Sequence, residues 1–293
     1  MAEEEGFNPE NVLAAMRAHA NQPQDIVDPT MQLTVAEVDR ARQVKAAVEA
    51  IPGLHSLSDF DIVQYALCAV DETMDQICHR VHCQQAFRQQ YQIDDTAAQG
   101  VALFSQMTLQ HPGMFLAADY LASSEGYMCI VDHAKFFPPK TDAQIRIHMA
   151  GTFYLNQALN PTFRAMRNGT TSMIECSGAS FDNMDLKYME KFAVEFFSHY
   201  PQKAKEKFFS SAESSITMLF ALWNRFLPAS IREKIHLGGE LSGMDGQRID
   251  VFYKQPTPEI ARDRLCRKVL HLLTRRYDNQ ANFSLSKPSV MDG

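Results

Sequence analysis

Residues 214–239 read SSITMLFALWNRFLPASIREKIHLGG, and the rest of the chain is best understood from this stretch. Apolar side chains recur in it at steps of three and four residues, which predicts a helix that ends or bends at Pro228. The helix is apolar nearly all round, so it is either an ordinary buried helix or one that moves between two apolar environments. A basic turn and a short strand pattern, Ile235–Leu237, complete the stretch.

The composition predicts a folded, acidic protein. Of the 293 residues, 45% are hydrophobic and 22% are charged, which allows a sizeable core. The net charge of −7 argues against a general nucleic-acid binder. The N-terminus is polar and no apolar run reaches the roughly 18 residues of a membrane span. The six cysteines show no framework spacing, so we expect free thiols in a cytoplasmic protein.

The first third of the chain has helical patterns only. Thr34 and Glu37 have the spacing of a capping box, in which each side chain satisfies a backbone N–H of the other. A further helix is predicted over 73–91, and Asp94 or Asp95 is expected to cap the next one. These patterns predict a helical bundle rather than a sheet.

From residue 126 onward, strand and helix patterns alternate. A capping box predicts a long helix over 141–159, and Asp182 or Asn183 is expected to cap another helix. A basic helix is expected from Pro258, and the tail after Tyr277 has the composition of a disordered segment. Strands are predicted at 127–131, 171–176, 207–209 and 235–237, and this alternation implies a small, mainly parallel sheet.

Three motifs in this order resemble the CRAL-TRIO lipid-transfer family, whose members include alpha-tocopherol transfer protein, cellular retinaldehyde-binding protein and phosphatidylinositol transfer proteins. The first is the Arg-Asn-Gly turn at 167–169 before a strand. The second is Tyr200-Pro201-x-Lys203-x-Lys205, and the third is Phe-Leu-Pro-x-Ser-Ile-x-x-Lys-Ile-His at 226–236, before Gly-Gly. The resemblance covers roughly residues 34–240.

The resemblance implies an α/β fold in which an N-terminal helical bundle precedes a CRAL-TRIO lobe with a small, mainly parallel sheet and a mobile gate helix. It suggests four parts. These are a flexible acidic N-terminus with a short helix at 1–30, a helical lobe at 31–110, a lipid-binding lobe at 111–255, and a basic C-terminal helix and tail at 256–293.

The resemblance also implies a monomeric carrier, without a cofactor, that encloses one hydrophobic ligand such as retinal, a tocopherol-like isoprenoid or a phospholipid. Such pockets are mainly apolar with a few orienting polar groups. Each candidate wall residue is as consistent with plain core as with a pocket lining. Candidate polar contacts are Tyr154, Glu175 and Ser177, and the candidate apolar wall is Phe153, Ile174, Phe181, Met218, Phe220, Leu222, Trp223 and Phe226.

Four cations are candidates for contact with anionic membranes, including a phosphoinositide headgroup. By position in the family's motifs they are Lys203, Lys205, Arg232 and Lys234, with the basic last helix as a possible addition. A solvated basic surface explains the same charges. An uncharged IVQYALCAV segment at 62–70 replaces the family's arginine-rich helix, which weakens the phosphoinositide inference.

Other classes of function have weaker support. The chain lacks the motifs of serine hydrolases, zinc proteases and nucleotide hydrolases, so we expect no enzyme. Cys176 has the position of a nucleophile but no assignable base. The Cys-His-Arg-Val-His-Cys run at 78–83 has no established zinc spacing, and the glycine-rich 238–246 lacks the ending of a phosphate loop. A module that senses lipid and binds a protein remains the alternative to a carrier.

Overall fold

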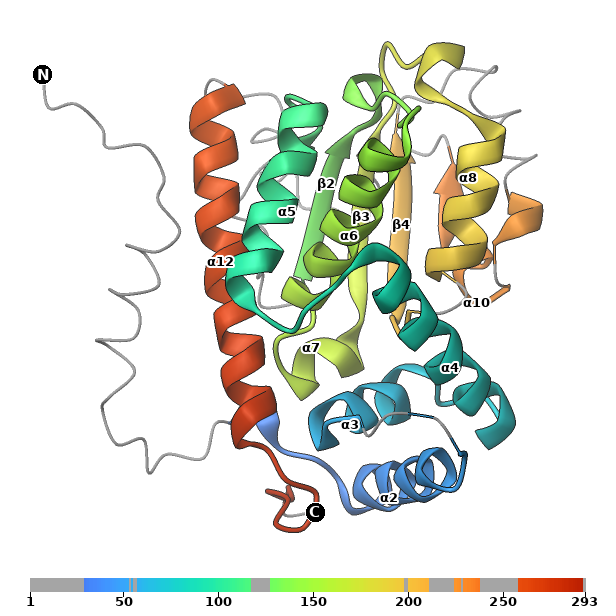
Figure 1. The fold of residues 1–293 in the computed structure, drawn as a ribbon, viewed down its shortest axis with the longest axis vertical. Coiled ribbons are helices and arrows are strands. Elements are labelled where there is room, and N and C mark those ends of the chain that lie inside the picture. Colours follow the sequence, from blue (N-terminus) through green and yellow to red (C-terminus); the bar gives the residue numbers. More distant parts are fainter. Residues whose placement is uncertain are drawn as a thin grey trace, which may run out of the picture.

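A computed structural model describes residues 29–52, 54, 57–116, 127–197, 200–210, 224–227, 229–237 and 258–291. The predicted helix near the N-terminus, most of the predicted gate helix and the glycine-rich 238–246 segment lie outside these residues. The predicted α/β class is confirmed, with a helical region followed by a lobe that contains a parallel sheet (Figure 1).

In the described residues, the N-terminal lobe contains four helices after a 3-10 turn at Pro29–Met31, namely α2 (Val35–Glu49), α3 (Asp59–Cys68), α4 (Met74–Tyr91) and α5 (Ala97–Gln110). The capping box that begins α2 is confirmed, because Thr34 and Glu37 bond to each other's backbone N–H groups. The prediction for the start of α5 is wrong. Thr96 caps this helix by accepting from Gln99 N, since its hydroxyl lies one residue nearer than Asp95 to the first helical turn.

The described part of the chain contributes five strands to the sheet, in sequence order: β1 (Phe115–Leu116), β2 (Tyr127–Asp132), β3 (Thr170–Glu175), β4 (Ala204–Ser210) and β5 (Ile235–Leu237). Strands β2 to β5 are parallel, and β1 pairs with β2 antiparallel. The four predicted strands are therefore confirmed. The sequence did not predict β1, because two residues are too few to show an alternating pattern.

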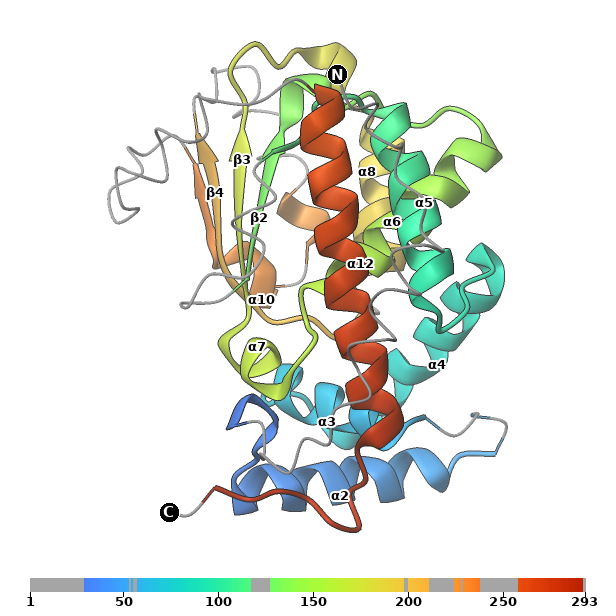
Figure 2. The same ribbon diagram turned by 90° about the vertical axis from the view of Figure 1, so that its left-hand side faces the viewer.

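Helices α6 (Asp142–Ala158) and α8 (Leu186–Phe192) lie on one face of this sheet (Figure 2). Helix α6 has the predicted capping box, and α7 (Phe163–Asn168) leads into β3. Helix α8 is capped by Asp185, not by Asp182 or Asn183, which lie in a separate 3-10 turn that Ser180 caps. The remaining elements are a 3-10 turn at His133–Lys135, a π-helical turn at Ala193–Phe197, a 3-10 turn at Asn224–Phe226, α10 (Ala229–Arg232) and α12 (Pro258–Asn282).

One hydrophobic core joins the N-terminal lobe to α6 and α12. Tyr154 of α6 packs over Gly100 of α5, where a Cβ atom would lie 2.7 Å from the tyrosine ring and 2.6 Å from Leu273 of α12. Phe153 is fully buried in the same core. The three predicted blocks at 31–110, 111–255 and 256–293 are thus in direct contact along α6.

The C-terminal segment is ordered, so the prediction of disorder after Tyr277 is wrong. Helix α12 continues to Asn282, and Leu33 then pairs with Val290 in a parallel bridge. Phe283 packs edge-on against Phe163 at 4.7 Å, and Leu285 is buried among the N-terminal helices. Burial of these apolar side chains overrides the polar composition of the segment.

Arg276 of α12 is fully buried, so it is not one of the cations that the basic last helix was expected to add to a membrane-contacting surface. Its guanidinium donates to Gln157 Oε1 at 2.7 Å and Asn160 O at 2.7 Å on the α6 side, and to Asp61 Oδ1 at 2.8 Å and Gln64 Oε1 at 2.7 Å in α3. It also lies over the ring of Phe60 at 5.0 Å. A charge becomes favourable inside a protein only with this density of partners.

Replacing Arg276 with Met should therefore lower the free energy of unfolding by about 3–5 kcal/mol, because Asp61 and three further acceptors lose their donor. Urea unfolding at pH 7 measures the effect. Arg267→Met on the exposed side of the same helix is the matched control and should change stability by less than about 0.5 kcal/mol. Equal effects of the two substitutions would show that the network contributes nothing specific.

Candidate functional site

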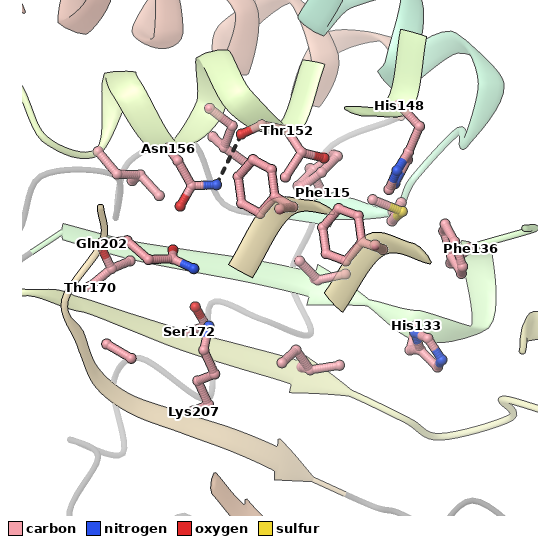
Figure 3. A pocket seen from close by; sticks show the side chains of 18 of the residues that line it. Phe115, His133, Phe136, His148, Thr152, Asn156, Thr170, Ser172, Gln202 and Lys207 are labelled. Carbon is pink, nitrogen blue, oxygen red and sulfur yellow. Dashed lines mark hydrogen bonds between the residues drawn. The ribbon is translucent and has the colours of Figure 1, made fainter. Parts of the chain in front are cut away.

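A cavity of about 220 Å³ lies between the sheet and the helices α6 and α8. On the helix side, its lining residues on α6 include Thr152, Leu155, Asn156 and Leu159, which recur at three- and four-residue steps and so share one helical face. Figure 3 shows His133, His148 and Phe136 at one end of the cavity and Asn156, Gln202 and Thr170 at the other.

On the sheet side, alternation along the strands decides which residues reach the cavity. Thr170, Ser172 and Ile174 occupy alternate positions of β3 and all three line it. On β4 the lining residues are Ala204 and Lys207, three positions apart. The register explains this spacing, because Ala204 pairs with Thr170 whereas Glu206, not Lys205, pairs with Thr171.

Lys205 is therefore the extra residue of a β-bulge. A one-residue shift moves every following side chain to the other face of a strand. The bulge thus places Lys207 on the cavity face and Glu206 on the opposite face, where Glu206 Oε2 lies 2.5 Å from Nε2 of His236. In a regular strand without the bulge, Glu206 would face the cavity.

Most of the cavity wall is apolar. Phe192 and Phe196 stack at 5.2 Å between ring centroids, and Phe115 packs on Phe104 at 5.5 Å. Such a wall favours an apolar ligand, and the few polar groups fix its orientation.

Histidines make up the polar group at one end. His133 and His148 line the cavity, and the ring of His111 lies edge-on to that of His148 at 5.5 Å. Nδ1 of His148 forms a hydrogen bond with the Tyr188 hydroxyl, while Nδ1 of His111 accepts from Phe137 N at 3.4 Å. Nε2 of His111 is buried and has no hydrogen-bond partner in the part of the chain that the structure describes.

These imidazoles are neutral near pH 7. Burial lowers the pKa of His111 to about 4 and the pKa of His133 to about 4. Burial and, less strongly, the neighbouring His111 lower the pKa of His148 to about 3. This end of the cavity therefore offers uncharged donors and acceptors of hydrogen bonds.

The polar group at the other end of the cavity contains Lys207. Among the described lining residues, it is the only Lys, Arg, Asp or Glu. Its register partner on β3 is Ser172. Asn156 Nδ2 donates to Thr152 O at 2.9 Å (Figure 3), and Gln202 Nε2 is buried without a hydrogen-bond partner among the described residues.

The structure brings few of the predicted ligand-binding residues together. Ile174 lines the cavity. Phe153 and Tyr154 lie on the opposite side of α6, in the core with α5 and α12, where the Tyr154 hydroxyl bonds to Asp94 O. They lie about 60° or more around α6 from every lining residue of this helix, since each residue advances about 100°.

The remaining predicted contacts lie outside the described cavity lining. Glu175 is buried and accepts from Ser177 N at 2.8 Å. Phe181 is 57% exposed, and Phe226 packs on Ala193, Leu227 and Ile231. The other four predicted wall residues, Met218, Phe220, Leu222 and Trp223, lie outside the described residues.

All four predicted membrane-binding cations are exposed. Lys203 and Lys205 lie at the start of β4, and Lys203 Nζ donates to Arg167 O at 3.0 Å. Arg232 ends α10, and Lys234 precedes β5, where its carbonyl accepts from Lys207 N at 2.8 Å. Because β4 and β5 are parallel neighbours, Lys203, Lys205 and Lys234 lie at the same end of the sheet, where these two strands begin.

The polar lining residues were missed by sequence reasoning. Lys207 was assigned to a strand, but its face depends on the bulge at Lys205, which no local pattern reveals. His133 and His148 are 15 positions apart and meet only through the fold. The hydrophobic face of α6 offered a usable signal, because Thr152 and Asn156 interrupt it four residues apart.

Among the described residues, neither Cys176 nor the 78–83 segment has the surroundings that nucleophilic or metal chemistry requires. Cys176 is fully buried, and burial, with Glu175 and Asp132 nearby, raises the pKa of its thiol to about 12. The thiolate required of a nucleophile is therefore disfavoured. Cys83 Sγ lies 3.6 Å from Nε2 of His79, but the described residues contain no group of three metal-binding side chains.

Comparison with known families agrees with this architecture. Residues 122–245 match the model of the CRAL/TRIO domain. The chain contains a CRAL/TRIO domain. The matched segment includes β2 to β5, α6 and α8, and hence most of the cavity wall. CRAL/TRIO domains bind lipophilic ligands in general, and their proteins are generally carriers rather than enzymes. No curated protein sequence matches the chain.

None of the helices in the described part of the chain combines the length and the apolar character required to cross a bilayer.

The neutral histidines predict a specific loss of stability in acid. Below about pH 6.5 the unfolded chain takes up protons on these imidazoles, whereas the folded protein does so only near pH 3–4. The contribution of the neutral histidines to the free energy of unfolding should therefore be fully present above pH 6.5 and should fall as the pH decreases from there. Each such histidine contributes a slope of about 1.4 kcal/mol per pH unit between its two pKa values.

Urea unfolding between pH 7 and pH 5 tests this expectation, since carboxylates titrate little there. His148→Phe should reduce the slope of stability against pH by about 1.4 kcal/mol per pH unit, the contribution of one proton, whatever its effect on absolute stability. An unchanged slope in His148→Phe would mean that this imidazole is protonated in the folded state.

Proposed function

We propose that this protein is a carrier that binds one hydrophobic ligand in the cavity beneath α6 and α8 and exchanges it with membranes. The observation that supports this proposal most strongly is an aromatic cavity with a polar group at each end, within the segment that matches the CRAL/TRIO domain. A retinoid such as retinal, a tocopherol-like isoprenoid and a phospholipid are the candidate ligands.

The protonation states of the side chains at the site favour binding over catalysis. The histidines at one end are uncharged at neutral pH, and Tyr188 has a pKa raised far above its usual value by burial. General acid–base catalysis near pH 7 works best with groups whose pKa lies near 7. These groups are suited instead to orienting a ligand by hydrogen bonds.

Native mass spectrometry of the purified protein tests ligand binding directly. We expect one lipid-sized adduct per chain. Ala204→Phe should reduce its occupancy at least about tenfold, because the added ring fills space at the cavity floor. Ala102→Phe, at an exposed position of α5, is the matched control and should retain the adduct. Full occupancy in a folded Ala204→Phe protein would place the ligand elsewhere.

We also propose that the four exposed cations attract the protein to anionic bilayers. Each cation near such a surface contributes about 1 kcal/mol, so four would give roughly 4 kcal/mol before salt screening. This attraction is strong enough for transient contact and weak enough to reverse. Membrane attraction is consistent with the position of Lys203, Lys205 and Lys234 at one end of the sheet, where β4 and β5 begin.

Replacing Lys203, Lys205, Arg232 and Lys234 with Ala should slow ligand transfer to vesicles that contain phosphatidylserine or phosphoinositide. Ligand affinity in solution should change little, since none of the four lines the cavity. Added salt should slow the wild type towards the variant. A variant that transfers as fast as the wild type would refute membrane attraction by these residues, and ligand binding without any transfer would favour a lipid-sensing module.

A further inference from the structure

Lys207 is an unusual residue for the floor of an apolar cavity. Among the described lining residues, no other side chain carries a permanent charge. A charge beside an apolar cavity interacts more strongly with an opposite charge than it would in water, because the local dielectric constant is lower. The ammonium group thus favours ligands with an anionic end.

The bulge at Lys205 is what brings this charge to the cavity. Lys207 pairs with Ser172 across parallel strands about 4.8 Å apart, and both residues line the cavity. A regular β4 would present Glu206 instead and would repel an anion. In Figure 3 Ser172 and Lys207 lie on the sheet side, below Gln202 and Asn156.

Gln202 supplies a second, independent observation. Its Nε2 is buried and finds no acceptor among the described residues, although it lines the cavity. Buried donors almost always have a partner, so an unpaired one beside a cavity indicates an acceptor on the bound molecule. An ammonium, a hydroxyl and an amide N–H together match a carboxylate or phosphate, whose oxygens accept several hydrogen bonds at once.

The rest of the cavity limits the size of the ligand. Its volume is about 220 Å³, whereas an engineered cavity of about 150 Å³ in another protein binds one benzene. The cavity is therefore too small for the two acyl chains of a phospholipid. Phe192 stacks on Phe196 and lies 5.7 Å from the ring of His148, so the apolar wall reaches the histidines and suits one apolar chain.

We propose that the cavity takes a single-chain lipid whose anionic end group, a carboxylate or a phosphate monoester, is held by Lys207 with Ser172 and Gln202 as hydrogen-bond donors. This inference rests on the carrier function proposed above and specifies its ligand class. The histidine end then contacts the far part of the chain, where its neutral groups do not repel an apolar or weakly polar terminus.

Calorimetric titration of the delipidated protein at pH 8 tests the inference with three probes of equal chain length, dodecanoate, dodecyl phosphate and dodecanol. Wild type should bind at least one of the two anions about tenfold or more tightly than dodecanol, and the tighter anion distinguishes a fatty acid from a phosphate ester. Lys207→Met should abolish this preference and leave dodecanol binding unchanged. Lys207→Arg should retain the preference, because it keeps the charge.

Lys187→Met is the matched control, since Lys187 is exposed on α8 beside the lining residue Tyr188. It should bind all three probes as the wild type does. The inference is overturned if dodecanol binds as tightly as both anions, if the Lys207→Met and Lys187→Met proteins behave alike, or if two-chain phosphatidate binds more tightly than every single-chain probe. In those cases the carrier function stands, because a hydrophobic ligand still binds. Failure of all the probes to bind would refute this inference, whereas the absence of a lipid-sized adduct in native mass spectrometry would refute the carrier function.

Discussion

The buried guanidinium of Arg276 is the interaction on which the rest of the fold depends. Its partners come from α3, from α6 and from the turn after α6, so one side chain of α12 connects segments more than 200 positions apart in the chain. An arginine does not lose its charge in a protein, and it is stable in the interior only when all its partners are in place. The N-terminal lobe, α6 and α12 are therefore positioned together.

This arrangement explains why a cavity can persist in front of α6. The rear face of the helix packs on α5 and α12 through Phe153 and Tyr154, and Gln157 receives the guanidinium. The front face, with Leu155 and Asn156, then faces the sheet across a space that is not filled by protein side chains. Because the helix is held from behind, collapse of the cavity would require loss of the rear contacts.

The sequence was a good guide to the elements and a poor guide to the lining of the cavity. Helix caps such as Thr34 and Thr141 and the strand patterns at β2 to β5 are local signals, and they were confirmed. Thr96 and Asp185 show that the choice among adjacent capping residues depends on the geometry of the turn before the helix. Sequence patterns do not specify this geometry.

The face of a side chain was harder to predict for a different reason. Phe153 and Leu155 are equally apolar, and only the packing of α5 and α12 decides that the first is core and the second faces the cavity. Lys207 reaches the cavity through one extra residue in β4, a non-local feature of strand pairing. The basic charge of Arg276 suggested a surface, because a buried arginine with several partners has no sequence signature.

The shared core has a consequence for how this protein is divided. The segment recognisable by homology, 122–245, includes α6 but neither of the helices that cover its rear face. An expressed fragment with those limits would present Phe153, Tyr154, Met149 and Ala150 to water as one continuous apolar strip. The segment that matches the CRAL/TRIO domain is thus smaller than the unit that closes its own hydrophobic core, so fragments intended for crystallography or for fusion need both α5 and the complete α12.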